Sequence, residues 1–127
     1  MLVDQSCLDY CHDNIVLSIS YIIMSKKLKD CSIYLKLLLT GNRLQSEAIL
    51  VTATDKQVEC ISEIIRNILR LPVSYKTKKL IKEYKKILDT LADKNNTIQK
   101  RLNIIHKSYS IILDVLLSVK KKLIPLL

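Results

Sequence analysis

The chain contains only one glycine and two prolines among its 127 residues, and this scarcity restricts its fold more than any other feature. A many-stranded sheet needs frequent tight turns, and Gly41, Pro72 and Pro125 supply too few residues of the kinds that form them. Phe and Trp are absent, so the core must be built from Leu, Ile and Val together with some of the six tyrosines. We therefore predict an all-α protein, a compact bundle of about four to six helices that forms a single domain over residues 1–127.

Capping residues and apolar periodicity set the expected helix boundaries. Gly41 stops one helix, and Thr54 with Gln57 fits a capping box that begins another, which Pro72 limits. Ser74 or Thr77 begins the next helix. Helices are expected over residues 4–24, 30–40, 43–51, 55–70, 75–93 and 98–123. The predicted core includes Ile61, Ile65, Leu80, Tyr84, Leu88, Leu102, Ile105 and Ile112.

The last expected helix, which Thr97 caps, carries a long apolar seam from Ile98 to Leu123. Further apolar residues between the seam positions widen it beyond the stripe of a simple coiled coil. This width favours burial inside the bundle. Contact with a partner, or with a second copy of the chain in a homo-oligomer, is the alternative use of the seam.

Positive charge is concentrated in the second part of the chain. Residues 1–70 carry eight Lys or Arg and eight Asp or Glu, whereas residues 71–127, the basic half, carry thirteen and four. A concentrated positive field attracts phosphate backbones, acidic proteins or anionic lipid. Solubility alone is the alternative role of these charges, although a solubilising surface normally mixes the two signs.

The basic half contains our candidate nucleic-acid-binding residues. Five lysines of the helix expected over residues 75–93 lie opposite its apolar face and form a lysine face. Lysine acts as a point charge, so we expect non-specific contacts to the nucleic-acid backbone. An acidic protein surface is the alternative partner, docked through the apolar last helix. The candidate residues are Lys76, Lys78, Lys79, Lys82, Lys85, Lys86, Lys100, Arg101, Lys120, Lys121 and Lys122.

No catalytic or cofactor-binding pattern is evident. Phosphate-binding loops, dinucleotide-binding glycines and metalloprotease helices are missing, so we expect no enzyme activity and no cofactor. Glu59 and Glu63 lie one turn apart, but Lys56 and Arg66 are placed to pair with them on a solvated surface. His106 is expected at the surface or its boundary.

The cysteines have two interpretations. Cys7, Cys11 and His12 form C-x3-C-H, but a zinc site lacks a fourth ligand at a recognised spacing. The acidic N-terminus is unlike a secretory signal, and the apolar stretch Asn14–Met24 is too short to span a bilayer. We therefore expect an intracellular protein, in the nucleus or cytoplasm or inside a virion. Its cysteines, which include Cys31 and Cys60, should be small buried thiols.

Two stretches carry a resemblance to a known family: TATDKQVECISEIIRNILRLPVS and LADKNNTIQKRLNIIHK, with the lysine-rich helix between them. They resemble the small basic proteins of Polinton/Maverick elements and adintoviruses, whose pattern joins a helix ending in N-[IVL]-L, a proline turn and L-A-[DN]-K. The match covers roughly residues 24–127. It implies a DNA-associated role inside a capsid, like that of the basic core peptides of adenovirus-type virions. Residues 1–23 fall outside the match, so we expect them to be an N-terminal extension.

Overall fold

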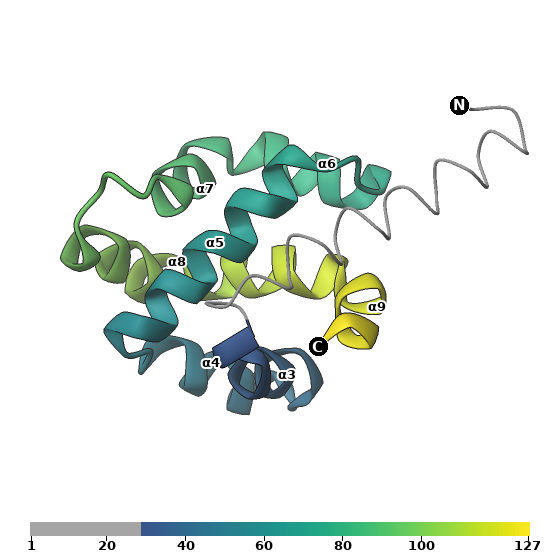
Figure 1. Ribbon diagram of the computed structural model, residues 1–127. Coiled ribbons are helices and arrows are strands. Elements are labelled where there is room, and N and C mark those ends of the chain that lie inside the picture. Colours follow the sequence, from purple (N-terminus) through teal and green to yellow (C-terminus); the bar gives the residue numbers. More distant parts are fainter. Residues whose placement is uncertain (1–28) are drawn as a thin grey trace, which may run out of the picture.

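The computed structural model describes residues 29–127 (Figure 1), so the expected helix over residues 4–24 and the expected extension over residues 1–23 lie outside this range. The all-α prediction is confirmed, because the described residues contain helices and no strand. The helices are α3 (Ser32–Thr40), α4 (Arg43–Val51), α5 (Asp55–Arg70), α6 (Tyr75–Glu83), α7 (Lys85–Ala92), α8 (Ile98–Ser118) and α9 (Lys120–Leu123), followed by the 3-10 helix η1 (Ile124–Leu126).

Local capping bonds begin most of these helices where the sequence predicts. The Thr54 hydroxyl accepts from the Gln57 amide N–H at 3.2 Å, and Gln57 Oε1 accepts from the Thr54 N–H at 3.0 Å, which completes the expected capping box of α5. Asn42 and Gln45 form a second box at α4. Ser74 and Thr97 cap α6 and α8. Each bond satisfies a backbone donor that the first turn of a helix leaves unpaired.

Gly41 ends α3 as predicted, and the reason is close packing rather than an unusual backbone angle. Its φ of −71° and ψ of 166° are open to any residue. A Cβ atom at this position would lie 3.0 Å from Leu37 O and 3.3 Å from Ser46 Oγ. Glycine therefore allows the short connection between α3 and α4 to fold tightly.

Helix α8 is the centre of the bundle, because it contacts α3, α4, α5, α6 and α7. Figure 1 shows α5 crossing in front of α8, with α6 and α7 along the upper edge and α3 and α4 along the lower edge. The largest fully buried side chains belong to these central helices and their neighbours: Leu38, Leu50, Val58, Ile61, Ile65, Leu88, Leu91, Ile105, Ile112, Leu113 and Leu116.

Of the eight residues predicted for the core, five are fully buried and three lie at its edge. Leu80, Tyr84 and Leu102 are half-buried and pack against the core. The positions that are fully buried are Ile61, Ile65, Leu88, Ile105 and Ile112.

The helix expected over residues 75–93 is interrupted, which the sequence analysis did not predict. At Tyr84 the backbone leaves the helical region, with φ −114° and ψ 27°, and this break separates α6 from α7. Similar breaks occur at Ser108, inside α8, and at Val119, between α8 and α9. On the two sides of the Tyr84 break, Thr77 of α6 and Leu88 of α7 are both fully buried, and α6 packs on α8 whereas α7 packs on both α5 and α8.

The expectation of reduced thiols is wrong for two cysteines. Cys31, just before α3, and Cys60 of α5 form a disulfide that spans 29 residues of sequence. Both cysteines are buried, as expected, but they are bonded to each other. The prediction failed because it inferred the redox state from a compartment instead of from the distance between α3 and α5. Cys7 and Cys11 lie outside the described residues.

Candidate anion-binding surfaces

Helix α6 presents a dense group of lysines to solvent. Ser74 caps the helix by accepting from the Thr77 amide N–H at 3.3 Å, and the helix then runs for nine residues. Leu80 and Ile81 face the core and are half-buried. The lysines of the helix are all exposed: Lys76, Lys78, Lys79 and Lys82. The predicted lysine face is therefore present on this helix.

Part of the lysine face forms a shallow, open depression along one side of α6, which we call the lysine groove, lined by Tyr75, Lys78, Lys79, Lys82 and Glu83. Tyr75 is 81 % exposed. Glu83 supplies the groove's one carboxylate among the described residues that line it. A hydrogen bond with Glu83 raises the pKa of Tyr84 above its usual value, so the carboxylate is engaged by its neighbour. The charge of the groove is positive.

The break at Tyr84 divides the lysine face that the sequence predicts. Lys85 and Lys86 are exposed, but they belong to α7 and do not continue the surface of α6 along one helix. The Lys85 ammonium also lies 2.6 Å from Asp89 Oδ2, four residues later. We therefore count Lys85 and Lys86 as neighbours of the lysine groove and not as part of it.

Arg101 is not available to nucleic acid, so its prediction as a phosphate contact is wrong. The residue is 3 % exposed, and its Nη1 donates to Ser62 Oγ at 3.0 Å. Its Nη2 pairs with Glu59 Oε1 at 2.6 Å. The cause lies in helix phase, because Ile98, Arg101 and Ile105 follow each other at steps of three and four on the buried side of α8.

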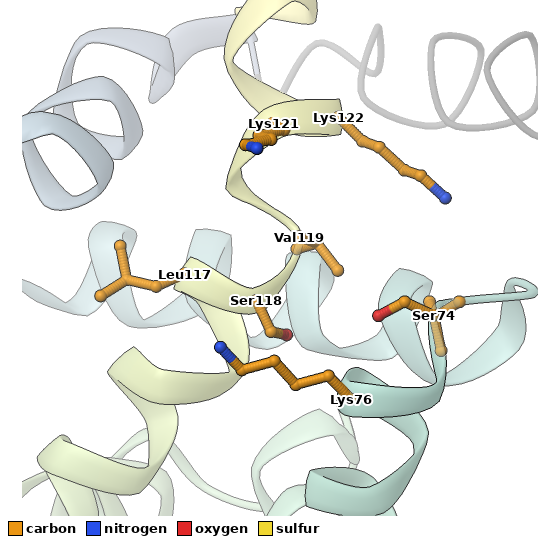
Figure 2. A pocket seen from close by; sticks show the side chains of 8 residues that line it. Ser74, Lys76, Leu117, Ser118, Val119, Lys121 and Lys122 are labelled. Atoms are coloured by element: carbon orange, nitrogen blue, oxygen red, sulfur yellow. The ribbon is translucent and has the colours of Figure 1, made fainter.

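The remaining candidates lie in two other places. Lys100 is exposed in the first turn of α8. Lys120, Lys121 and Lys122 follow the break at Val119, and Lys121 and Lys122 line a pocket together with Lys76 of α6 (Figure 2). The structure thus assembles residues that are far apart in sequence, which no local pattern could predict.

The residues weighed for acid–base or metal chemistry serve other purposes. Glu59 pairs with Arg101, a partner that the sequence analysis did not predict, and Arg66 Nε donates to Ala92 O at 2.9 Å. His106 is exposed, as predicted, and its Nε2 lies 2.9 Å from Val51 O. Within residues 29–127 no three potential metal ligands gather. The C-x3-C-H residues Cys7, Cys11 and His12 lie outside this range.

The apolar face of α8 is used by the fold. Ile105, Ile112, Leu113, Val115 and Leu116 are buried against the other helices. Burial inside the bundle, the preferred interpretation of the seam, is therefore correct. The alternatives in which this face docks an acidic partner or a second copy would require the bundle to open.

Tyr75 is the residue that sequence reasoning missed at the lysine groove, because the lysine face was defined from its lysines alone. A local signal was present. Tyr75 lies three and four residues before Lys78 and Lys79, which places the ring on the lysine side of α6.

Comparison with known proteins gives no relative: no family model, no curated protein and no solved structure matches the chain. No helix among residues 29–127 has both the length and the apolar character needed to cross a bilayer.

Proposed function

We propose that the protein is a non-enzymatic binder of nucleic-acid backbone that acts through the lysine groove of α6. The observation that carries this proposal is the grouping of Lys78, Lys79 and Lys82 around one open groove, next to an exposed tyrosine ring. Lys78 and Lys79 lie on one turn of α6 and Lys82 lies on the next, so the three ammonium groups can contact neighbouring phosphates of a strand.

The chemistry of the groove favours phosphate over specific base recognition. Lysine is a compact point charge that contacts phosphate well, whereas arginine is the residue that reads guanine edges or carboxylates with two parallel bonds. The lysine groove contains no arginine among the described residues that line it. Tyr75 offers one aromatic surface, which suits sequence-tolerant contact with a base or sugar. Binding should therefore depend little on sequence.

The resemblance to the small basic proteins of Polinton/Maverick elements and adintoviruses supports a viral or virus-like setting for this binding. We propose that the protein belongs to a virus or virus-like mobile DNA element and contacts its DNA or other virion components. An acidic protein surface is the competing partner for the same lysines, and the following experiment separates the two.

Duplex DNA of random sequence should bind the intact protein, and the logarithm of affinity should fall with the logarithm of salt concentration by about 0.9 per phosphate contact. Changing Lys78, Lys79 and Lys82 together to Gln should weaken binding to every sequence and reduce that slope by about 2.7. Fluorescence anisotropy with a labelled duplex over a series of salt concentrations measures both quantities.

The matched control removes the same charge elsewhere. Lys36, Lys56 and Lys107 are exposed lysines of α3, α5 and α8, and none of them lines the lysine groove. Their joint change to Gln should leave most of the affinity and the slope in place. Equal losses in the two triple variants would assign binding to net charge alone. If the intact protein does not retard DNA even at low salt, the proposal is wrong and the acidic-partner alternative replaces it.

A further inference from the structure

A second basic pocket lies apart from the lysine groove, where α6 begins and α8 ends. Its volume is about 380 Å³, within the range of small-molecule sites. Lys76, Lys121 and Lys122 provide three ammonium groups, and the described residues that line the pocket include no carboxylate. Lys76 is more than forty positions away from the other two lysines in sequence, so the fold creates this concentration of charge.

The break at Val119 is what brings the lysines together. The backbone leaves the helical region there, with φ −111° and ψ 10°, and α9 starts in a new direction. Figure 2 shows Lys121 and Lys122 on α9 at one side of the pocket and Lys76 on α6 at the other, with the Ser74 and Ser118 hydroxyls turned toward each other between them. A straight continuation of α8 would not return these lysines to α6.

A relay of hydroxyl groups fixes the two sides of the pocket relative to each other. Thr77 Oγ1 donates to Ser118 Oγ at 2.8 Å, and Ser118 Oγ donates to Val115 O at 2.6 Å. Because the Thr77 proton is used in this way, the 3.1 Å contact between Ser74 Oγ and Thr77 Oγ1 is one in which Ser74 donates. Thr77 is fully buried. All three hydroxyl protons are thus committed to the structure, and the ammonium groups are the donors that remain for a ligand.

The walls of the pocket define which anion fits. Val73, Leu117 and Val119 contribute apolar surface beside the lysines. The first turn of α6, which has amide N–H groups without partners inside the helix, begins at the pocket and adds partial positive charge. Three lysines and no carboxylate among the described lining residues make the pocket positive, and a compact dianion neutralises more of this charge than a single negative charge does. The apolar walls leave room for an organic group attached to that anion.

We infer that this pocket binds a phosphomonoester dianion, presented either by a small phosphorylated molecule or by the 5′ end of a nucleic-acid strand. This site is independent of the lysine groove, which is proposed to contact the phosphodiester backbone. The two sites share no lining residue.

The test uses thymidine 5′-monophosphate as the probe and thymidine as its control, titrated into the full chain in phosphate-free buffer and followed by calorimetry. The nucleotide should bind saturably with a Kd on the order of 1 mM or tighter, and thymidine should not bind. Changing Lys76, Lys121 and Lys122 together to Gln should weaken nucleotide binding at least about tenfold. Affinity should also fall below about pH 6, where a phosphomonoester loses its second charge.

The matched variant is the lysine groove triple, K78Q/K79Q/K82Q. It removes the same number of positive charges as the pocket triple variant, but all of them from α6. It should retain nucleotide binding while losing duplex binding, so the failure of one proposal is distinguishable from the failure of the other. An unchanged melting temperature of the pocket triple variant shows that its loss of binding is not due to unfolding. No saturable binding up to about 10 mM nucleotide, or equal losses in the two triple variants, would overturn the inference.

A pair of oligonucleotides identifies the source of the phosphate. If a single strand with a 5′-phosphate binds more tightly than the same strand with a 5′-hydroxyl, and the pocket triple variant abolishes the difference, the pocket takes strand ends. If the two strands bind equally while the nucleotide binds in the pocket, its ligand is a small phosphorylated molecule.

Discussion

At the scale of single residues, Arg101 shows that a charged side chain in a basic segment can be buried and so be unavailable at the surface. Counting charges along the sequence places it with the lysines, yet it is buried in α8 and bonded to Ser62 and Glu59. Its Nε has no hydrogen-bond partner among the described residues, so the guanidinium is only partly satisfied. The stability of a buried guanidinium depends strongly on the partners that remain bonded to it.

Changing Arg101 to Ala should lower the free energy of unfolding by about 2–4 kcal/mol. Removal of one partner leaves the Glu59 carboxylate beside a cavity, although its 32 % exposed side chain moderates the cost. Chemical denaturation measures the change. The control is the adjacent Lys100→Ala, which is exposed and should change stability by less than about 0.5 kcal/mol. Equal effects of the two substitutions would show that the buried ion pair does not stabilise the fold.

The Cys31–Cys60 disulfide should contribute about 3–4 kcal/mol, because it closes a loop of 29 residues in the unfolded chain. Replacing both cysteines by Ala should therefore lower the midpoint of guanidinium denaturation by a corresponding amount. Adding a thiol reductant should destabilise the natural chain but not the double variant. If the reductant leaves the denaturation midpoint of the natural chain unchanged, the disulfide does not stabilise the folded state.

At the scale of helices, local signals were sufficient for beginnings and ends but not for interruptions. Thr54 with Gln57, Ser74 and Thr97 all cap helices where their sequence positions predict, since capping depends on residues within one turn. The breaks at Tyr84 and Val119 have no glycine or proline to signal them. They follow from contacts between distant segments, and the division of the lysine face and the pocket of Lys76 could not be predicted for the same reason.

The Thr77 hydroxyl should hold α6 against the end of α8. Changing Thr77 to Val preserves the shape of the side chain but removes its bonds to Ser74 and Ser118, so we expect a cost of about 1–2 kcal/mol. Thermal unfolding followed by circular dichroism measures this cost. The control is Thr90→Val, since the Thr90 hydroxyl bonds only the Lys86 carbonyl of its own helix in the described contacts. A variant at position 77 as stable as that control would exclude the relay as a stabilising link.

At the scale of the whole molecule, neutral and basic parts of the sequence share one core. Helix α8 from the basic half packs on α3, α4 and α5 from the neutral part, so the change in charge near Pro72 does not mark a domain boundary. The core can be predicted well from periodicity because aliphatic residues at steps of three and four along α5 and α8 are buried together. The candidate sites could be predicted only as a region, since their residues meet through the tertiary structure.

A shared core predicts that the described helices unfold together. Leu88 of α7 and Ile105 of α8 are fully buried, and truncating either to Ala should cost about 2–5 kcal/mol. The control is Leu44→Ala, because Leu44 is 78 % exposed and should contribute little. For each variant, far-ultraviolet circular dichroism reports helix content and tyrosine fluorescence reports packing, and the two should give one coincident transition. If Leu88→Ala separates the two curves while Ile105→Ala does not, α7 and its lysines would form a unit that opens independently, and the single-domain prediction would fail.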